Sequence, residues 1–239
     1  MKKHQILIWV SVFAITMGIF EGSVVVYLRA LYYPSGFNFP LVPFNNLIGF
    51  TELIRELASL FMLLSVGIIA GKNFSQRFAW FLYSFAVWDI IYYVFLYLIL
   101  GWPESLLTWD ILFLLPVIWT GPIVAPVLIS ILMIILALVI YNFNIKTDNK
   151  VKILRKEWII LISGSVIVFL SFIWDYCRFL INHISFHEFQ SRKISDKLFD
   201  LSVQYVPESF NWIIFSCGFL VIVSGILILY KRLLNLSIN

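Results

Sequence analysis

Long apolar runs dominate this sequence and limit what the chain can fold into. Six stretches of mostly apolar residues follow one another, and only short polar breaks separate them. A helix needs about 20 such residues to cross the hydrocarbon core of a bilayer. Because 62% of the 239 residues are hydrophobic and only 13% are charged, the chain suits lipid rather than water as its solvent. The sequence predicts an all-α, polytopic helical membrane protein.

The polar breaks place the spans. We expect helices at 6–28, 47–70, 78–100, 123–141, 158–180 and 210–230, forming a single bundle domain over 1–239. The stretch from 109 to 141 is too long for one upright helix and contains three prolines. A re-entrant half-helix over 109–119, followed by the fourth span, fits this stretch. The residues just before it, 101–110, form either a re-entrant lid or a stiff interfacial loop.

Basic residues predict the orientation, because Lys and Arg near helix ends stay in the cytoplasm. With both termini inside, the cytoplasmic side holds eleven of the 17 basic residues, including five in the loop after the fourth span. We therefore expect a protein of the plasma (inner) membrane with both termini in the cytoplasm. The formal charge of +4 is scattered over short loops and builds no basic face, so we expect no nucleic-acid partner.

Charged residues inside the predicted spans are the strongest indication of a functional site. Each costs about 2.5 to 3.5 kcal/mol on insertion scales, so each needs a partner or a purpose. Nearly all of them fall in the predicted extracytoplasmic half. The candidate cavity residues are Glu21, Glu52, Arg55, Glu56, Asp89, Asp175 and Arg178.

Helical spacing predicts which of these residues share a face. Glu52, Arg55, Glu56 and Ser59 recur at intervals of three and four residues, so they form one stripe that should turn inward. The fifth span repeats this spacing, and in the third span two tyrosines follow the acid. These further sets are Ser171, Trp174, Asp175 and Arg178, and Asp89 with Tyr92 and Tyr93.

The first span carries small residues at every fourth position. Ala14, Gly18 and Gly22 follow the pattern that lets two membrane helices approach closely. Glu21 flanks this face. We therefore expect its carboxylate to point into the bundle rather than into lipid.

The intramembrane charges do not balance. Five acids stand against two arginines, or three if Arg29 reaches inward. This excess favours a permease-like protein that handles a proton, a cation or a small polar solute through an outward-facing cavity, with Glu56 and Asp89 exchanging protons. Three alternatives remain open. In the first, Glu52 with Arg55 and Asp175 with Arg178 are purely structural ion pairs that lock the helices together. Glu21 and Asp89 are then protonated and hydrogen-bonded. In the second, the chain is a non-catalytic subunit or assembly factor of a larger complex, and in the third it is an intramembrane enzyme acting on a lipid or isoprenoid.

Recognised catalytic motifs are missing from the sequence. It has no phosphate-binding loop, nucleophile elbow or Cys/His cluster. His183 and His187 have a spacing that suits zinc, but an exposed amphipathic segment explains them better. Cys177 and Cys217 fit small apolar core residues. We expect no metal and no cofactor, an activity that is not enzymatic, and the lipid bilayer and partner membrane subunits as the partners.

Overall fold

Helices make up most of the computed structural model, which describes residues 3–43, 45–147, 151–184 and 194–238. Six helices are long and apolar enough to cross a membrane, which confirms the predicted fold class and places the chain in a membrane. They are α1 (Lys3–Tyr32), α2 (Asn46–Ala70), α3 (Phe74–Leu100), α4 (Val124–Lys146), α5 (Arg155–His183) and α8 (Trp212–Ile238). A short helix, α7 (Ile194–Ser202), lies between α5 and α8.

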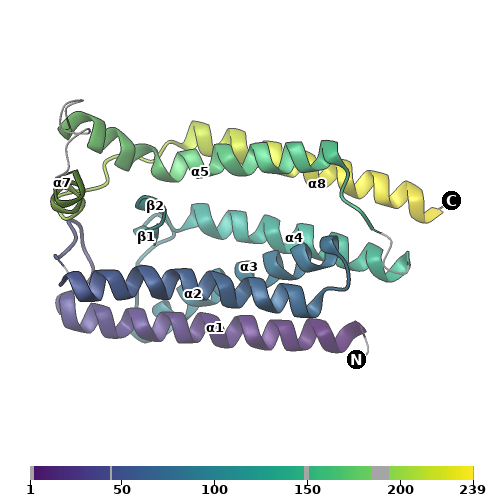
Figure 1. Cartoon of the computed structure of the whole chain (residues 1–239), viewed down its shortest axis with the longest axis horizontal. Helices are drawn as coiled ribbons and strands as arrows, with labels where there is room; N and C mark the ends of the chain where they lie inside the picture. The colour runs from purple at the N-terminus through teal and green to yellow at the C-terminus, as the bar shows by residue number, and fades with distance from the viewer. Residues whose placement is uncertain (1–2, 44, 148–150, 185–193, 239) are drawn as a thin grey trace.

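The six long helices form two groups (Figure 1). In the first group, α3 packs against α1, α2 and α4. In the second, α5 and α8 pack closely along each other and reach the first group through α4 and through a short strand, β2 (Trp119–Pro122). The N- and C-termini lie at one end of the molecule, and α7 lies at the other end.

Small residues let the helices within each group approach closely. A Cβ atom at Gly18 of α1 would lie 2.8 Å from the Trp88 carbonyl oxygen of α3, so only glycine fits there. Ala14, one turn earlier, is fully buried. The predicted close-contact face of the first span is therefore confirmed. A Cβ at Gly164 of α5 would lie 3.0 Å from the carbonyl oxygen of Gly218 in α8, which gives the second pair a similar contact.

Residues 109–122 form a β-hairpin, so the prediction of a half-helix over 109–119 was wrong. Strand β1 (Trp109–Phe113) pairs antiparallel with β2. Pro116 has no N–H group to donate, and its ring clashes with the preceding turn of a helix, so a helix cannot continue through it. Strand pairing satisfies the backbone groups of this segment instead, as is required of non-helical chain buried within a membrane protein.

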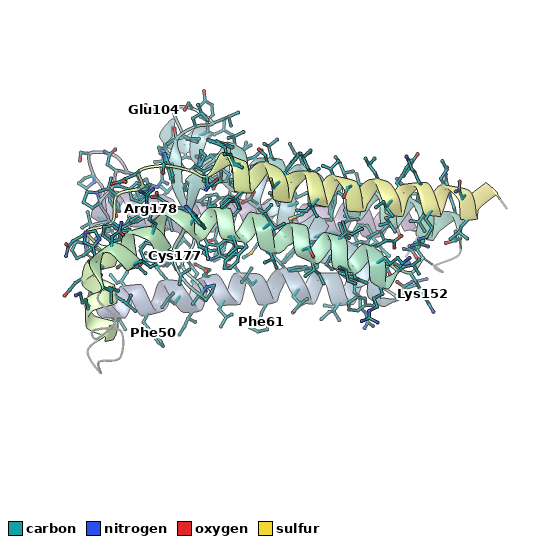
Figure 2. All side chains as sticks on the ribbon, turned by 90° about the horizontal axis from the view of Figure 1, so that it is seen from above. Phe50, Phe61, Glu104, Lys152, Cys177 and Arg178 are labelled. Carbon is teal, nitrogen blue, oxygen red and sulfur yellow. The ribbon has the colours of Figure 1, made fainter. Side chains whose placement is uncertain are left out.

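The outward faces of the helices are apolar. Figure 2 shows Phe50 and Phe61 on α2 pointing away from the other helices. Both side chains are more than half exposed. Such residues suit contact with lipid, while the polar face of α2 turns inward.

Candidate functional site

Three charged side chains join α1 to α2. Arg55 forms ion pairs with Glu21 through Nη1 and with Glu52 through Nε, and the second pair has a distance of 2.7 Å from Nε to Oε2. The Ser59 hydroxyl donates to the other oxygen of Glu21 at 3.1 Å. Both carboxylates are buried. The spacing of the α2 stripe thus predicted its inward face correctly, and one arginine serves two acids.

Glu56, the remaining member of the α2 stripe, binds the hairpin. Its carboxylate accepts hydrogen bonds from the backbone N–H groups of Leu114 and Leu115, at 2.9 and 3.2 Å. These two amides lie where the chain turns between β1 and β2, beyond the strand pairing. Glu56 therefore satisfies backbone donors that have no partner in the ladder, and it ties the hairpin to α2.

A second ion pair lies between α1 and the hairpin. The Arg29 Nη2 atom is 3.6 Å from the Asp110 Oδ1 atom, and both residues are buried. The Arg29 guanidinium also lies over the ring of Trp102, 3.6 Å from its centroid, and near the ring of Phe37. Asp110 is in β1, outside the six spanning helices. Burial raises its pKa to about 7, although the nearby Arg29 and the Tyr93 hydroxyl lower it.

Asp89 lies near the middle of α3, at the wall of an internal cavity of about 160 Å³. The Ser130 hydroxyl of α4 donates to Asp89 Oδ2 at 2.7 Å. Within the part of the chain that the structure describes, this is the one hydrogen bond to the carboxylate, and no Lys or Arg lies within ion-pair distance. Asp89 is half-buried because its carboxylate faces the cavity.

Aromatic side chains make up much of the cavity wall around Asp89. Phe85, Trp88, Phe113, Trp119 and Phe172 all line it. The polar part of the lining consists of Glu21, Asp89, Tyr92, Tyr93 and Ser130. The cavity is thus an acidic pocket with aromatic walls.

A second cavity of about 140 Å³ lies on the other side of the hairpin. Its polar lining consists of Arg29, Tyr33, Glu52, Glu56, Tyr92 and Asp110. The two cavities share the side chains of Tyr92 and of residues 111–113 as a common wall. Together they bring five carboxylates near two guanidinium groups, and the structure places Glu56 and Asp89 in different cavities.

Asp175 lies apart from these cavities and holds a loop. It accepts a hydrogen bond from the Tyr205 hydroxyl at 2.8 Å and bonds from the backbone N–H groups of Glu208 and Ser209. The Thr120 hydroxyl of β2 lies 2.9 Å from the Tyr205 oxygen and continues this chain. Asp175 therefore joins α5 to the segment before α8 and to the hairpin.

The expected pair between Asp175 and Arg178 is absent from the described residues, and the inward stripe on the fifth span is only half right. Ser171 and Asp175 are buried, but Trp174 and Arg178 are exposed. In Figure 2, Arg178 lies on α5 at the end of the molecule opposite Lys152. The backbone amides after Tyr205 replace the arginine as partners of the Asp175 carboxylate.

Sequence reasoning missed Asp110 and Ser130 and left Arg29 undecided. Asp110 fell in the segment read as a half-helix, where no helical spacing linked it to the other acids. Ser130 is a single hydroxyl in an otherwise apolar helix. A tryptophan directly precedes both Asp89 and Asp110 in the sequence, and both acids line the cavities. This shared Trp-Asp pattern could have indicated that Asp110 belongs to the site.

Among the described residues there is no group of three or more His, Cys, Asp or Glu side chains that could hold a metal ion. His183 ends α5, and its Nδ1 atom lies 2.8 Å from the Phe179 carbonyl oxygen. His187, the other member of the predicted pair, lies outside the described residues.

Comparison of the chain with protein-family models, with curated proteins and with solved structures finds no match.

Proposed function

We propose that this membrane protein is permease-like and binds a proton or another cation at Asp89, in the cavity between α3, α4 and the hairpin. The supporting observation is the Asp89 carboxylate itself. It lines a cavity near the middle of a spanning helix, and among the described residues a single serine hydroxyl is its partner. A carboxylate within a spanning helix that has no cationic partner needs a positive charge, which a proton or a bound cation supplies.

The charges around the cavities support a cation over an anion. Arg55 is shared between Glu21 and Glu52, and Arg29 is paired with Asp110. Neither guanidinium is left for an anionic solute. Glu56 has two backbone amides as partners and Asp89 has one hydroxyl, so among the described residues these two cavity-lining carboxylates are the ones without an arginine partner.

Of these two acids, Asp89 is the better binding group. Both oxygens of the Glu56 carboxylate accept backbone hydrogen bonds, which makes it a structural tie. The Asp89 carboxylate retains capacity for further bonds and faces open space. The two cavities on either side of the hairpin then form the route between Asp89 and the end of the molecule where α7 lies.

In the proposed orientation both termini are in the cytoplasm of a cell with an inner membrane. The second cavity and the hairpin then face the extracytoplasmic side, and Asp89 is near the bilayer midplane. The charge bias of the sequence supports this orientation. Assembly with partner subunits is compatible with the proposal, because the cavity is built from this chain alone.

Charge displacement in proteoliposomes tests the proposal. Purified protein is adsorbed on a solid-supported membrane and exposed to concentration jumps of H⁺, Na⁺, K⁺ and benzyltrimethylammonium. We expect a transient current with at least one of these cations, its loss in Asp89→Asn, and its retention in Asp200→Asn, which removes an exposed carboxylate on α7. The absence of current with all four cations, or an undiminished current in Asp89→Asn, would overturn the proposal.

A further inference from the structure

A third cavity adjoins the one at Asp89. It has a volume of about 310 Å³ and lies between the α5–α8 pair and the two helices α3 and α4. Its lining is almost entirely apolar and includes Phe81, Leu132, Leu161, Phe169 and Ile222. This volume is about twice the roughly 150 Å³ of an apolar protein cavity that accommodates benzene. The space is therefore large enough for a substantial apolar group.

The apolar cavity and the acidic cavity share part of their walls. Phe85, Trp119, Ile129, Met133 and Phe172 belong to both linings. Met133 is unbranched and flexible, so it can move aside at little cost. One ligand could therefore place a charged group at Asp89 and an apolar group beyond this shared wall.

The apolar cavity also has a side that faces lipid. The α5–α8 pair reaches the other helices through α4 and β2, so α3 and α5 face each other across the cavity. Ser165 of α5 belongs to the lining, and this residue is exposed. Its hydroxyl donates a hydrogen bond to the Leu161 carbonyl oxygen in its own helix, so the hydroxyl proton needs no partner from a ligand. This side allows an apolar group to enter from the bilayer.

We propose that the ligand is a lipophilic organic cation, with its ammonium group at Asp89 among aromatic rings and its apolar body in the cavity between α3 and α5. This inference rests on the proposed function and narrows its substrate class. A bare metal ion or a proton has no apolar surface that would fill a cavity of this size. A neutral amphiphile would leave the Asp89 carboxylate without a positive partner, whereas aromatic faces attract an ammonium group.

Binding of two cations that differ in their apolar body tests the inference. The probes are benzyltrimethylammonium and tetramethylammonium, and binding to the protein in nanodiscs is measured by equilibrium dialysis against empty nanodiscs. We expect benzyltrimethylammonium to bind at least about tenfold more tightly, because burial contributes about 25 cal/mol per Å² of apolar surface. Equal affinities would overturn the inference.

Two matched substitutions locate the apolar body. Ser165→Phe fills the lipid-facing side of the cavity, and Ser65→Phe makes the same change on the exposed face of α2, where the serine has the same intrahelical bond. We expect Ser165→Phe to lower the affinity for benzyltrimethylammonium to that for tetramethylammonium, and Ser65→Phe to leave it unchanged. Identical behaviour of the two variants would refute the assigned position.

The outcomes separate the two proposals. If both probes bind equally in the wild type and both are lost in Asp89→Asn, the cation site stands and the lipophilic class is wrong. If Asp89→Asn binds both probes as well as the wild type does, both proposals are wrong.

Discussion

Removing Arg55 should destabilise the protein more than removing its partners together with it. Arg55 bonds two buried carboxylates, Glu21 and Glu52, and its own side chain is 21% exposed. Stranding one partner of a buried pair costs about 3 to 5 kcal/mol. Two charge-assisted hydrogen bonds at about 1.5 to 3 kcal/mol each give a similar figure. We therefore expect Arg55→Ala to lower the free energy of unfolding by about 3 to 5 kcal/mol.

Neutralising the acids should reverse much of this loss. In Arg55→Ala combined with Glu52→Gln, one stranded charge is gone, and in the triple variant with Glu21→Gln both are gone. We expect stability to rise in that order, with the triple variant recovering at least about half of the loss, because coupled charges show interaction energies of about 0.5 to 3 kcal/mol. Arg178→Ala is the control, since it removes an exposed arginine and should change stability by at most about 0.5 kcal/mol.

Intrinsic tryptophan fluorescence during heating in detergent measures these differences. For a chain of this length about 1 kcal/mol shifts the midpoint by roughly 2 to 4 °C, so Arg55→Ala should lower it by about 6 to 20 °C. The reasoning fails if the losses of the single substitutions simply add in the double and triple variants. Additivity would mean that the three charges do not depend on one another.

Three further predictions follow from the same structure. The pKa of Asp110 is about 7 in the folded state, against 3.8 for an unperturbed Asp, so between these pH values the folded state holds a proton that the unfolded state has lost. The free energy of unfolding should therefore fall by up to about 1.4 kcal/mol per pH unit as the pH rises through this window. Asp110→Asn should remove this slope from the pH dependence of thermal unfolding. Gly18→Ala should lower the midpoint by an amount that corresponds to about 1 to 3 kcal/mol, because its Cβ would meet the α3 backbone, whereas Gly49→Ala, with open space around it, should not. Cysteines at Ser35 and Lys152 should differ in labelling by an impermeant thiol reagent added to intact cells, with only the first reacting, and labelling of the second alone would reverse the orientation.

Hydropathy predicted the helices well because the requirement is local. A span needs only about 20 apolar residues in a row, and each of the six predicted ranges lies, to within two residues, on one of the long helices of the structure. Helical spacing likewise predicted that Glu52 and Glu56 turn inward, because residues three and four apart share a face whatever surrounds them. These features depend on a few neighbouring residues.

Features that depend on distant partners could not be predicted in this way. The hairpin is stabilised by Glu56, more than 50 residues earlier in the chain, and the Asp110 carboxylate meets Arg29 of the first helix. Arg178 has the spacing of an ion-pair partner, but the loop after Tyr205 brings backbone amides to Asp175 instead. A side chain and a backbone N–H group from another segment can compete for the same carboxylate. Such competition does not follow any helical spacing, so the sequence pattern does not reveal which partner is bound.

Chemical accessibility of the cavity at Asp89 tests the central claim most directly. Met133 lines this cavity, so Met133→Cys, with Cys177 and Cys217 replaced by alanine, reports on the space beside the carboxylate. We expect a positively charged methanethiosulfonate reagent to react faster there than a negatively charged one of similar size, because Asp89 attracts cations, and we expect Asp89→Asn to abolish the preference. Equal rates for the two reagents, or no reaction with either, would contradict a cation site at Asp89.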